Sequence, residues 1–112
     1  MARPRTRPPI APVLTRFAER LQDKIGAERV LLFGSHASGR ARPDSDYDII
    51  VVSPRFEGLR RRDRALGLRD LFYEVGGHAP MDLICLTPEE FEHARHRITL
   101  IAEVLPEAID LL

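Results

Sequence analysis

Three short runs rich in apolar residues constrain the fold of this chain more than any other feature of its sequence. They are RVLLF at 29–33, DYDIIVV at 46–52, and the run centred on 81–86 in APMDLICLT. Each run is rich in residues that favour strands and is bounded by glycine, proline or polar residues, which is typical of buried β-strands. A further run, AIDLL at 108–112, is expected to form a short last strand. The chain is therefore expected to build a small β-sheet.

The segments between these runs favour helices. Apolar residues recur at helical spacing over 13–26 and again over 57–75, where we expect one helix with most of its arginines on a solvated face. Thr87 and Pro88 start another helix, with acidic residues in its first turn and helical spacing that runs on through Val104. This order predicts an α/β (α+β) domain, a small mixed sheet of three to four strands flanked by helices.

Length and composition fit one ordinary domain. The chain has 112 residues, and we expect a flexible Pro- and Arg-rich arm at 1–12 followed by a single domain at 13–112. The formal net charge is +0, so no direct nucleic-acid binding is expected. The single Cys85 provides no disulfide framework, no apolar run could span a bilayer, and the arm lacks the apolar segment of a secretory signal. We therefore expect a cytoplasmic protein without membrane contact.

Three carboxylates stand where two of the predicted strands begin. Asp46 and Asp48 open the second run, and strand alternation places both on the same face. Asp82 enters the third run in the same way, so the three acids meet if the two strands are neighbours with aligned starts. Carboxylates that are buried unpaired are costly, and a cation is the usual compensation. Two hard oxygen donors one strand step apart suit Mg²⁺.

A Gly-Ser pair, Gly34 and Ser35, follows the first run. Glycine lets the backbone approach an anion closely, successive free N–H groups can bind it, and the serine hydroxyl adds a donor. One end of the sheet would then combine phosphate donors with carboxylates that hold a metal. Phosphoryl or nucleotidyl transfer requires these parts, because it depends on positioning and on charge neutralisation.

Each of these residues also has a purely structural interpretation. The acids could be a solvent-facing strand end, Gly34 a tight turn and Ser35 a helix cap. Asp44 is expected to shape the turn before the second strand, and His36 is expected to be an exposed turn histidine, although it could donate to a phosphate. Cys85 alternates onto the face opposite the acids and is expected in the core.

The segment GSHASGRARPDSDYDIIVV resembles the signature of the DNA polymerase β-like nucleotidyltransferases. Its form, Gly-Ser-x-Ala-x-Gly followed by Ser-Asp-x-Asp, is similar to the minimal (MNT-type) branch, and the resemblance extends over nearly the whole chain from residue 13. Many relatives carry arginine where this chain has Ser38, and Arg40 or Arg42 could replace it. The residues that carry the resemblance are Gly34, Ser35, Ala37, Gly39, Ser45, Asp46 and Asp48, with Asp82 matching the third carboxylate of the family.

The resemblance implies a polymerase β-like nucleotidyltransferase fold and a set of site residues. Asp46 and Asp48 would bind Mg²⁺, and Asp82 would complete the metal site or act as the base on the acceptor hydroxyl. The catalytic and metal-binding residues would thus be these three acids. Gly34, Ser35 and Ser45 would bind the nucleoside triphosphate, which is expected to be ATP.

The resemblance also implies a partner. Members of the minimal branch are often antitoxins paired with an all-helical HEPN toxin, and some transfer AMP from ATP to a tyrosine of that toxin. We therefore expect transfer of AMP onto a hydroxyl of a partner protein. A non-catalytic module that masks a toxin or only binds nucleotide, and a transferase acting on a small molecule, remain alternatives. The many apolar residues over 100–112 also suggest contact with another subunit, including a homo-oligomer.

Overall fold

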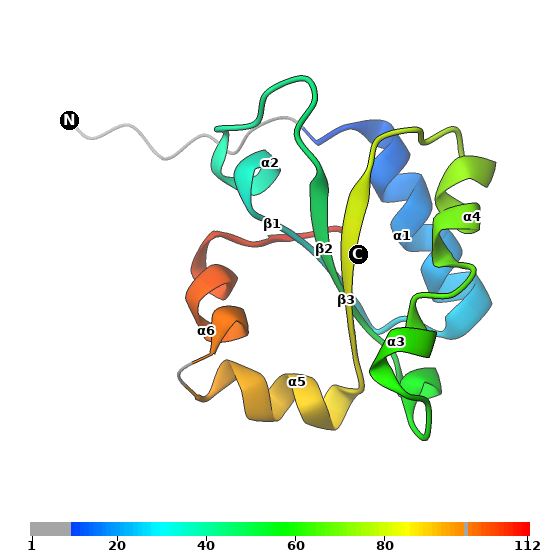
Figure 1. The fold of residues 1–112 in the computed structure, drawn as a ribbon, viewed down its shortest axis with the longest axis vertical. Coiled ribbons are helices and arrows are strands. Elements are labelled where there is room, and N and C mark those ends of the chain that lie inside the picture. Colours follow the sequence, from blue (N-terminus) through cyan, green and yellow to red (C-terminus); the bar gives the residue numbers. More distant parts are fainter. Residues whose placement is uncertain (1–9, 98) are drawn as a thin grey trace.

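A single mixed sheet organises the fold, seen here in a computed structural model that describes residues 10–97 and 99–112. Its strand order is β3-β2-β1-β4 (Figure 1). β2 pairs with β3 in parallel, whereas β1 pairs with both β2 and β4 in antiparallel. The predicted fold class is thereby confirmed. The strands are β1 (Arg29–Phe33), β2 (Tyr47–Val52), β3 (Met81–Leu86) and β4 (Ile109–Asp110).

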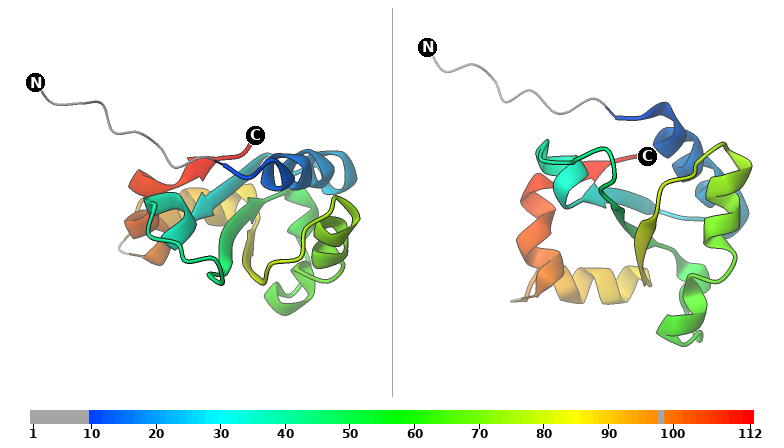
Figure 2. Two further views of the ribbon diagram at one scale, coloured as in Figure 1. Left: turned by 90° about the horizontal axis from the view of Figure 1, so that it is seen from above. Right: turned by 45° about the horizontal axis from the view of Figure 1, so that its top comes forward.

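Helices cover both faces of the sheet, so the domain has three layers (Figures 1 and 2). One face carries α1 (Pro12–Ile25), α3 (Arg61–Arg64) and α4 (Leu68–Glu74), with the short 3₁₀ turn η1 (Pro54–Phe56). The other face carries α5 (Pro88–Arg95), α6 (Leu100–Val104) and η2 (Leu105–Glu107). A single helical turn, α2 (Ser35–Ser38), follows β1 directly.

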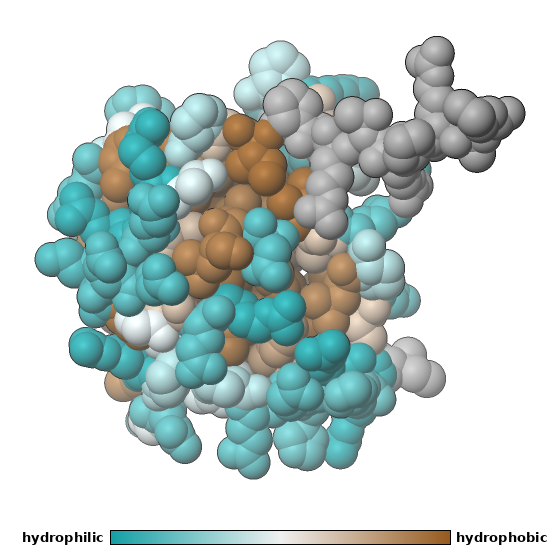
Figure 3. All heavy atoms as spheres, turned by 180° about the vertical axis from the view of Figure 1, so that it is seen from behind, coloured by the Kyte–Doolittle hydropathy of each residue, from teal (hydrophilic) through white to brown (hydrophobic). Residues whose placement is uncertain are grey.

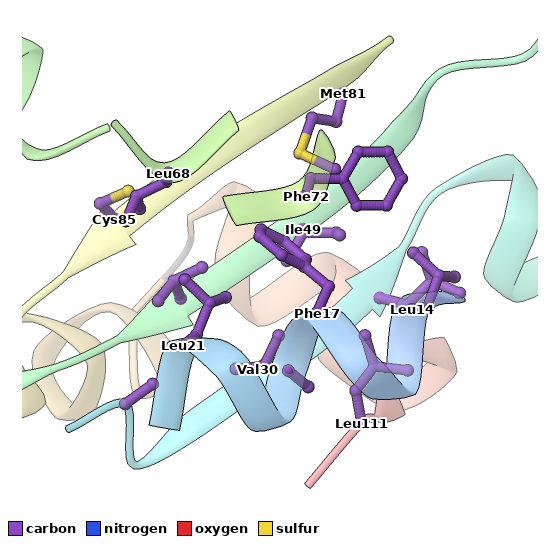
Figure 4. Close-up of a cluster of buried hydrophobic side chains, with 14 of the residues drawn as sticks. Leu14, Phe17, Leu21, Val30, Ile49, Leu68, Phe72, Met81, Cys85 and Leu111 are labelled. Atoms are coloured by element: carbon purple, nitrogen blue, oxygen red, sulfur yellow. The ribbon is translucent and has the colours of Figure 1, made fainter. Parts of the chain in front are cut away.

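The helix predicted over 13–26 is confirmed as α1. Proline occupies its first turn, and Gly26 ends it in a left-handed conformation at φ 60°. Its buried stripe packs on the sheet and on α4, where the rings of Phe17 and Phe72 meet edge to face with centroids 5.2 Å apart (Figure 4). Burial of this stripe fixes α1 and α4 against the same face of the sheet.

The single helix predicted over 57–75 is wrong. The segment divides into α3 and α4, with Gly67 between them at φ 81°. Leu59 and Leu66, expected on the buried face, are 47% and 74% exposed, whereas Arg64, expected in solvent, is only 8% exposed. The physical reason lies in the partners of Arg64, whose guanidinium donates to two backbone carbonyls and to a carboxylate. Arg64 is buried because its charge and its N–H donors find partners there, and the apolar periodicity of the segment does not decide which residue is buried.

The predicted start of the next helix is confirmed, but its length is not. Thr87 and Glu90 form a capping box at the N-terminus of α5. The helical spacing through Val104 does not produce one helix, because α5 ends at Arg95 and Thr99 caps a separate α6. The Thr99 hydroxyl also donates to the Ala94 carbonyl at 2.7 Å, which joins the two short helices.

The two ends of the chain differ from expectation in detail. Residues 1–9 of the predicted arm lie outside the described residues, and helix α1 already begins at Pro12. At the other end, Ile109 and Leu111 are buried against the sheet, while Leu100 and Leu112 remain exposed.

On the side of the molecule opposite to the view of Figure 1, apolar residues form a surface band that hydrophilic residues interrupt (Figure 3). In the described part of the chain, no helix combines the length and apolarity needed to cross a membrane.

β3 lies at one edge of the sheet, and two arginines cover part of its outer side. The Pro80 and Leu86 carbonyls accept bonds from Tyr47 and Ser53 N–H, so even-numbered carbonyls face β2 and odd-numbered ones face outward. Arg69 donates to the outward carbonyl of Met81 at 3.2 Å. Arg64 donates to that of Cys85 at 3.1 Å. These bonds satisfy backbone acceptors that an edge strand would otherwise leave open.

Candidate active site

The parallel pairing of β2 and β3 brings the predicted acids together. Asp48 and Asp82 are direct register partners, so the two strands are neighbours that begin at the same level, which is the condition under which the three acids were expected to meet. Ile50 lies on the same face of β2 as Asp48, and Leu86 lies on the same face of β3 as Asp82. Both Ile50 and Leu86 pack in the apolar cluster under α5 and α6. Asp48 and Asp82 therefore project from that side of the sheet. Asp46 lies just before the first residue of β2 and is exposed.

The turn after β1 presses onto one of these acids. Phe33 pairs with Asp48, which leaves Gly34 directly beside that carboxylate. A Cβ at Gly34 would overlap the Asp48 Oδ2 atom, and the residue adopts φ 75°. Both facts require glycine at this position. The structure thus places Gly34 against Asp48, and Ser35 follows as the first residue of α2.

Asp46, Asp48 and Asp82 form a group that we call the acid cluster, and their negative charges repel one another. Burial raises the pKa of Asp48, and the neighbouring Asp82 and Asp46 raise it further, whereas His36 acts in the opposite direction. Among residues 10–97 and 99–112, no arginine, lysine or histidine forms an ion pair with any of the three acids. A bound cation would relieve this repulsion.

The donor set fits Mg²⁺, although the side chains do not form a closed site. Within the described residues, no three His, Cys, Asp or Glu side chains are arranged as a ready-made metal centre. Mg²⁺ commonly takes one or two protein carboxylates and completes its shell with water and phosphate oxygens. Asp46 and Asp48 would supply these ligands, with Asp82 beside them.

A hollow of about 350 Å³ lies beside the turn, and we call it the turn hollow. Gly34, Ser35 and Ser38 line one side of it together with Arg40. The positive charge of Arg40 could therefore face a phosphate in this hollow. Arg40 would then take the role of the arginine that many relatives carry at the position of Ser38. The other side is formed by α6 and η2 through Glu103, Val104 and Glu107. The turn hollow thus offers donors on one wall and carboxylates on the other.

Ser45 has a structural role in the loop before β2. Its Oγ accepts a bond from the Arg42 N–H at 2.8 Å, and its own N–H donates to the Arg42 carbonyl at 3.0 Å. These two bonds close the turn that delivers Asp46 and Asp48 to the sheet. Ser45 does not line the turn hollow, and its contact with nucleotide stays a prediction.

His36 is a residue whose role the sequence interpretation missed. It is half-buried, its Nε2 donates to the Ser45 carbonyl at 2.9 Å, and its ring packs on Tyr47 with centroids 4.2 Å apart. His36 therefore ties α2 to the loop that carries Asp46. The aromatic residue between the two acids of Asp-x-Asp was the available signal, because a nearby ring can pack on it.

A second hollow of about 380 Å³ lies toward the sheet face that carries α4, and we call it the β3 hollow. Asp46 and Asp82 form its rim next to the acid cluster. Its remaining wall comes from α4 and the loop before β3, a region for which the sequence offered no motif. The residues of this wall are Arg69, Phe72, Tyr73, His78, Ala79, Pro80 and Met81.

The comparisons with known proteins give one family match and several structural likenesses. Residues 14–107 match the family model of the nucleotidyltransferase domain. A crystal structure of a candidate nucleotidyltransferase from Sulfolobus solfataricus is 20% identical, with a TM-score of 0.58 over 88% of this chain and 76% of that chain. A toxin-antitoxin structure with AMP-PNP is 22% identical, with a TM-score of 0.60 over 88% and 72%.

Structural likeness at this level of identity shows the fold alone. BolA1 from Arabidopsis thaliana is also similar, at 23% identity and a TM-score of 0.55 over 72% of this chain and 98% of that chain. A search of curated protein sequences found no match. The family match, which spans most of the chain, therefore carries more weight for function than any single neighbour.

Proposed function

The chain belongs to the nucleotidyltransferase domain family, and from this premise we propose a Mg²⁺-dependent transfer of AMP from ATP onto a hydroxyl of a partner protein. One observation carries the proposal: Asp48 lies between Gly34 on one side and Asp82 on the other. A carboxylate suited to metal binding and a glycine turn suited to phosphate binding are thereby in direct contact. That juxtaposition is what a nucleoside triphosphate with a divalent cation requires.

Each residue would have a separate task. Gly34 and Ser35 would bind the outer phosphates, with Arg40 providing a positive charge in the same hollow. Asp46 and Asp48 would hold the cation, which would neutralise the triphosphate and favour departure of pyrophosphate.

The transfer itself is an in-line displacement. The acceptor oxygen attacks the α-phosphorus, the bond from that phosphorus to the oxygen bridging to the β-phosphorus breaks, and pyrophosphate leaves. The acceptor proton passes to the Asp82 carboxylate. His36 keeps the loop of Asp46 beside α2 throughout and touches no reacting atom in this scheme.

The partner in this proposal is an all-helical toxin of the HEPN type. The similarity to a toxin-antitoxin structure that contains AMP-PNP supports both a protein partner and an adenine nucleotide. This likeness is one of fold, so the partner needs its own test.

The test is transfer of label from [α-³²P]ATP to a co-expressed partner protein. Asp46→Asn and Asp48→Asn should abolish labelling, while Asp44→Asn should not, because Asp44 is exposed in the turn and is outside the acid cluster. Labelling that survives both of the first two changes would overturn the mechanism.

A non-catalytic role is the second candidate, and one observation favours it. Glu103 and Glu107 face the turn hollow, and their charges would oppose a phosphate there. The chain would then neutralise a toxin by covering it. Full protection of cells by the Asp46→Asn protein, with the complex still formed, would favour masking over chemistry.

A further inference from the structure

We propose that a basic groove between α3 and α5 is the docking surface for an acidic segment of the partner protein. The groove is a hollow of about 350 Å³, and we call it the α5 groove. The inference rests on the proposed function and deepens it, because it assigns the surface that would hold the acceptor protein. The walls come from the start of α3, from α5 and from the residue range just after α5, through Arg61, Glu89, Glu90, His93, Ala94 and Arg97.

The α5 groove lies at the far end of the sheet from the acid cluster. β2 and β3 run in parallel from the acids, and α3 and α5 come after the opposite ends of these strands. Figure 1 shows α3 beside the start of α5, at the end of the β2–β3 pair away from α2. A strand rises about 3.3 Å per residue, so Leu86 lies roughly 13 Å from Asp82 along β3. A partner held in the groove would therefore leave the acid cluster open to nucleotide.

The walls of the α5 groove are held together by a buried arginine. Arg64 is only 8% exposed, and its guanidinium donates to the Leu59 carbonyl before α3 and to the Glu90 carboxylate on α5. Glu90 also accepts a bond from the Thr87 N–H at 2.8 Å, which fixes its carboxylate at the start of α5. Arg61 lies 3.6 Å from the other carboxylate oxygen of Glu90. The groove is thus formed before a partner arrives, and a preformed surface loses less entropy on binding.

Positive charge predominates around the groove. Arg64 already balances the charge of Glu90. Arginine guanidinium groups pair with carboxylates through two parallel hydrogen bonds, so an acidic segment matches this surface. The other exposed groups of fixed charge in and just before α3 and along the groove are four arginines against two acids, namely Arg60, Arg61, Arg62 and Arg97 against Asp63 and Glu89.

Two features favour a protein segment over a nucleic acid. Glu89 and Glu90 line the groove, and a continuous phosphate backbone would meet their carboxylates. The Leu59 side chain is 47% exposed although Arg64 holds its carbonyl, and Ala94 lies in the groove. Apolar contacts are therefore available next to the arginines. A segment that carries both carboxylates and apolar side chains can use both kinds of contact.

The experiment measures the fluorescence anisotropy of a fluorescein-labelled peptide mixed with the full chain at physiological ionic strength. The probe peptide repeats two glutamates, a leucine and an alanine, and the reference peptide has glutamine in place of every glutamate. We expect the acidic peptide to bind about tenfold more tightly than the reference. Mg²⁺ with ATP should not displace the peptide, because the groove is remote from the acid cluster.

Variants locate the binding. Arg61→Gln and Arg97→Gln should each weaken binding of the acidic peptide about threefold, and the double variant should weaken it about tenfold, as expected for exposed ion pairs. Arg95→Gln is the matched control, because it removes the same charge from the same helix. Arg95 pairs with Glu92 and does not line the groove, so this change should leave peptide binding unaltered. In the labelling assay the double variant should label the partner more slowly, with ATP binding unchanged.

The docking inference and the proposed function fail in different ways. If the acidic peptide binds no better than the glutamine peptide, or if Arg95→Gln weakens binding as much as Arg61→Gln, the docking inference is overturned. If a single-stranded oligonucleotide of the same length binds more tightly and depends on the same arginines, the groove binds nucleic acid and the inference is again overturned. If the wild type transfers no label while peptide binding follows the expected pattern, the proposed function is overturned and the groove remains the docking surface of a masking protein.

Discussion

The Asp48 Oδ2 atom occupies the place where a side chain of Gly34 would stand. This contact joins the end of β1 to the start of β2, and it brings a backbone suited to phosphate binding against a carboxylate suited to metal binding. Two further carboxylates lie close enough to act on Asp48 electrostatically. The candidate site therefore depends on a residue that contributes no side chain.

Gly34→Ala is expected to lose nucleotide binding in addition to stability. An alanine at φ 75° and ψ −152° costs about 1–3 kcal/mol, and its methyl group must also displace Asp48 or open the turn. Gly39→Ala is the matched control, because Gly39 has φ 80° with open space around its missing Cβ. Both variants should lower the denaturation midpoint, and only the first should lose binding of Mg²⁺ and ATP in calorimetry. Equal nucleotide binding by the two variants would contradict this prediction.

His36→Ala is expected to weaken nucleotide binding without removing a catalytic group. The change deletes the bond to the Ser45 carbonyl and the packing on Tyr47, so the loop of Asp46 is no longer tied to α2. Loss of one hydrogen bond and one aromatic contact corresponds to about 1–2 kcal/mol. KM for ATP should rise while kcat changes less, and His36→Gln should recover part of the loss. A fall in kcat alone, with KM unchanged, would point to a chemical role instead.

Arg64→Met is expected to destabilise the fold more than any change of its exposed neighbours. The Arg64 guanidinium donates to the Leu59 and Cys85 carbonyls and pairs with Glu90. Its removal leaves buried acceptors without a donor, at a cost of about 2–4 kcal/mol. Arg62→Met, on the exposed side of α3, should change the free energy of unfolding by less than about 0.5 kcal/mol. Urea unfolding measures both, and equal losses would contradict the assigned role.

Acid should remove a specific part of the stability through Glu90. Partial burial raises the pKa of Glu90, but hydrogen bonds from Arg64 and Thr87 outweigh it and lower the pKa from 4.5 to about 2. A carboxyl with a depressed pKa in the folded state stabilises the fold above its unfolded pKa, and this contribution is lost as the pH falls. The free energy of unfolding should therefore decline between about pH 5 and pH 2.

Glu90→Gln provides the control for that acid dependence. The variant should be less stable than the wild type at pH 7 and should lose less stability on acidification. A wild-type profile that is flat from pH 5 to pH 2, or one that Glu90→Gln leaves unchanged, would contradict the assignment.

The strands and the acid cluster were predictable because their signals are local. Apolar runs set β1 to β3, and Asp48 and Asp82 stand at equivalent points of two runs, so they meet once the two strands pair in parallel. The turn at Gly34 was predictable for the same reason, since a glycine after a buried strand commonly marks a tight turn or a close approach.

The remainder depended on contacts between distant segments. Nothing near Arg64 in the sequence indicates that it will bond to Cys85 and Glu90, so apolar periodicity suggested one helix where charge satisfaction produces two. The β3 hollow could not be predicted from the sequence either, because its walls come from α4 and from the loop before β3. Ser45 matched the family signature, yet in the structure its Oγ is engaged in its own loop.

Asp48→Asn is expected to make the protein more stable and inactive at once. Burial and the charges of Asp82 and Asp46 raise the pKa of Asp48, so the ionised carboxylate destabilises the fold at neutral pH when no cation is present. The neutral amide removes that repulsion at nearly the same volume. In EDTA the variant should therefore have a higher Tm than the wild type. Mg²⁺ with ATP should raise the Tm of the wild type and leave that of the variant almost unchanged. Asp44→Asn, outside the cluster, should behave as the wild type in both conditions. A lower Tm for Asp48→Asn in EDTA would show that Asp48 has a stabilising partner in the fold. It would argue against a site in which the three carboxylates repel one another until a cation binds.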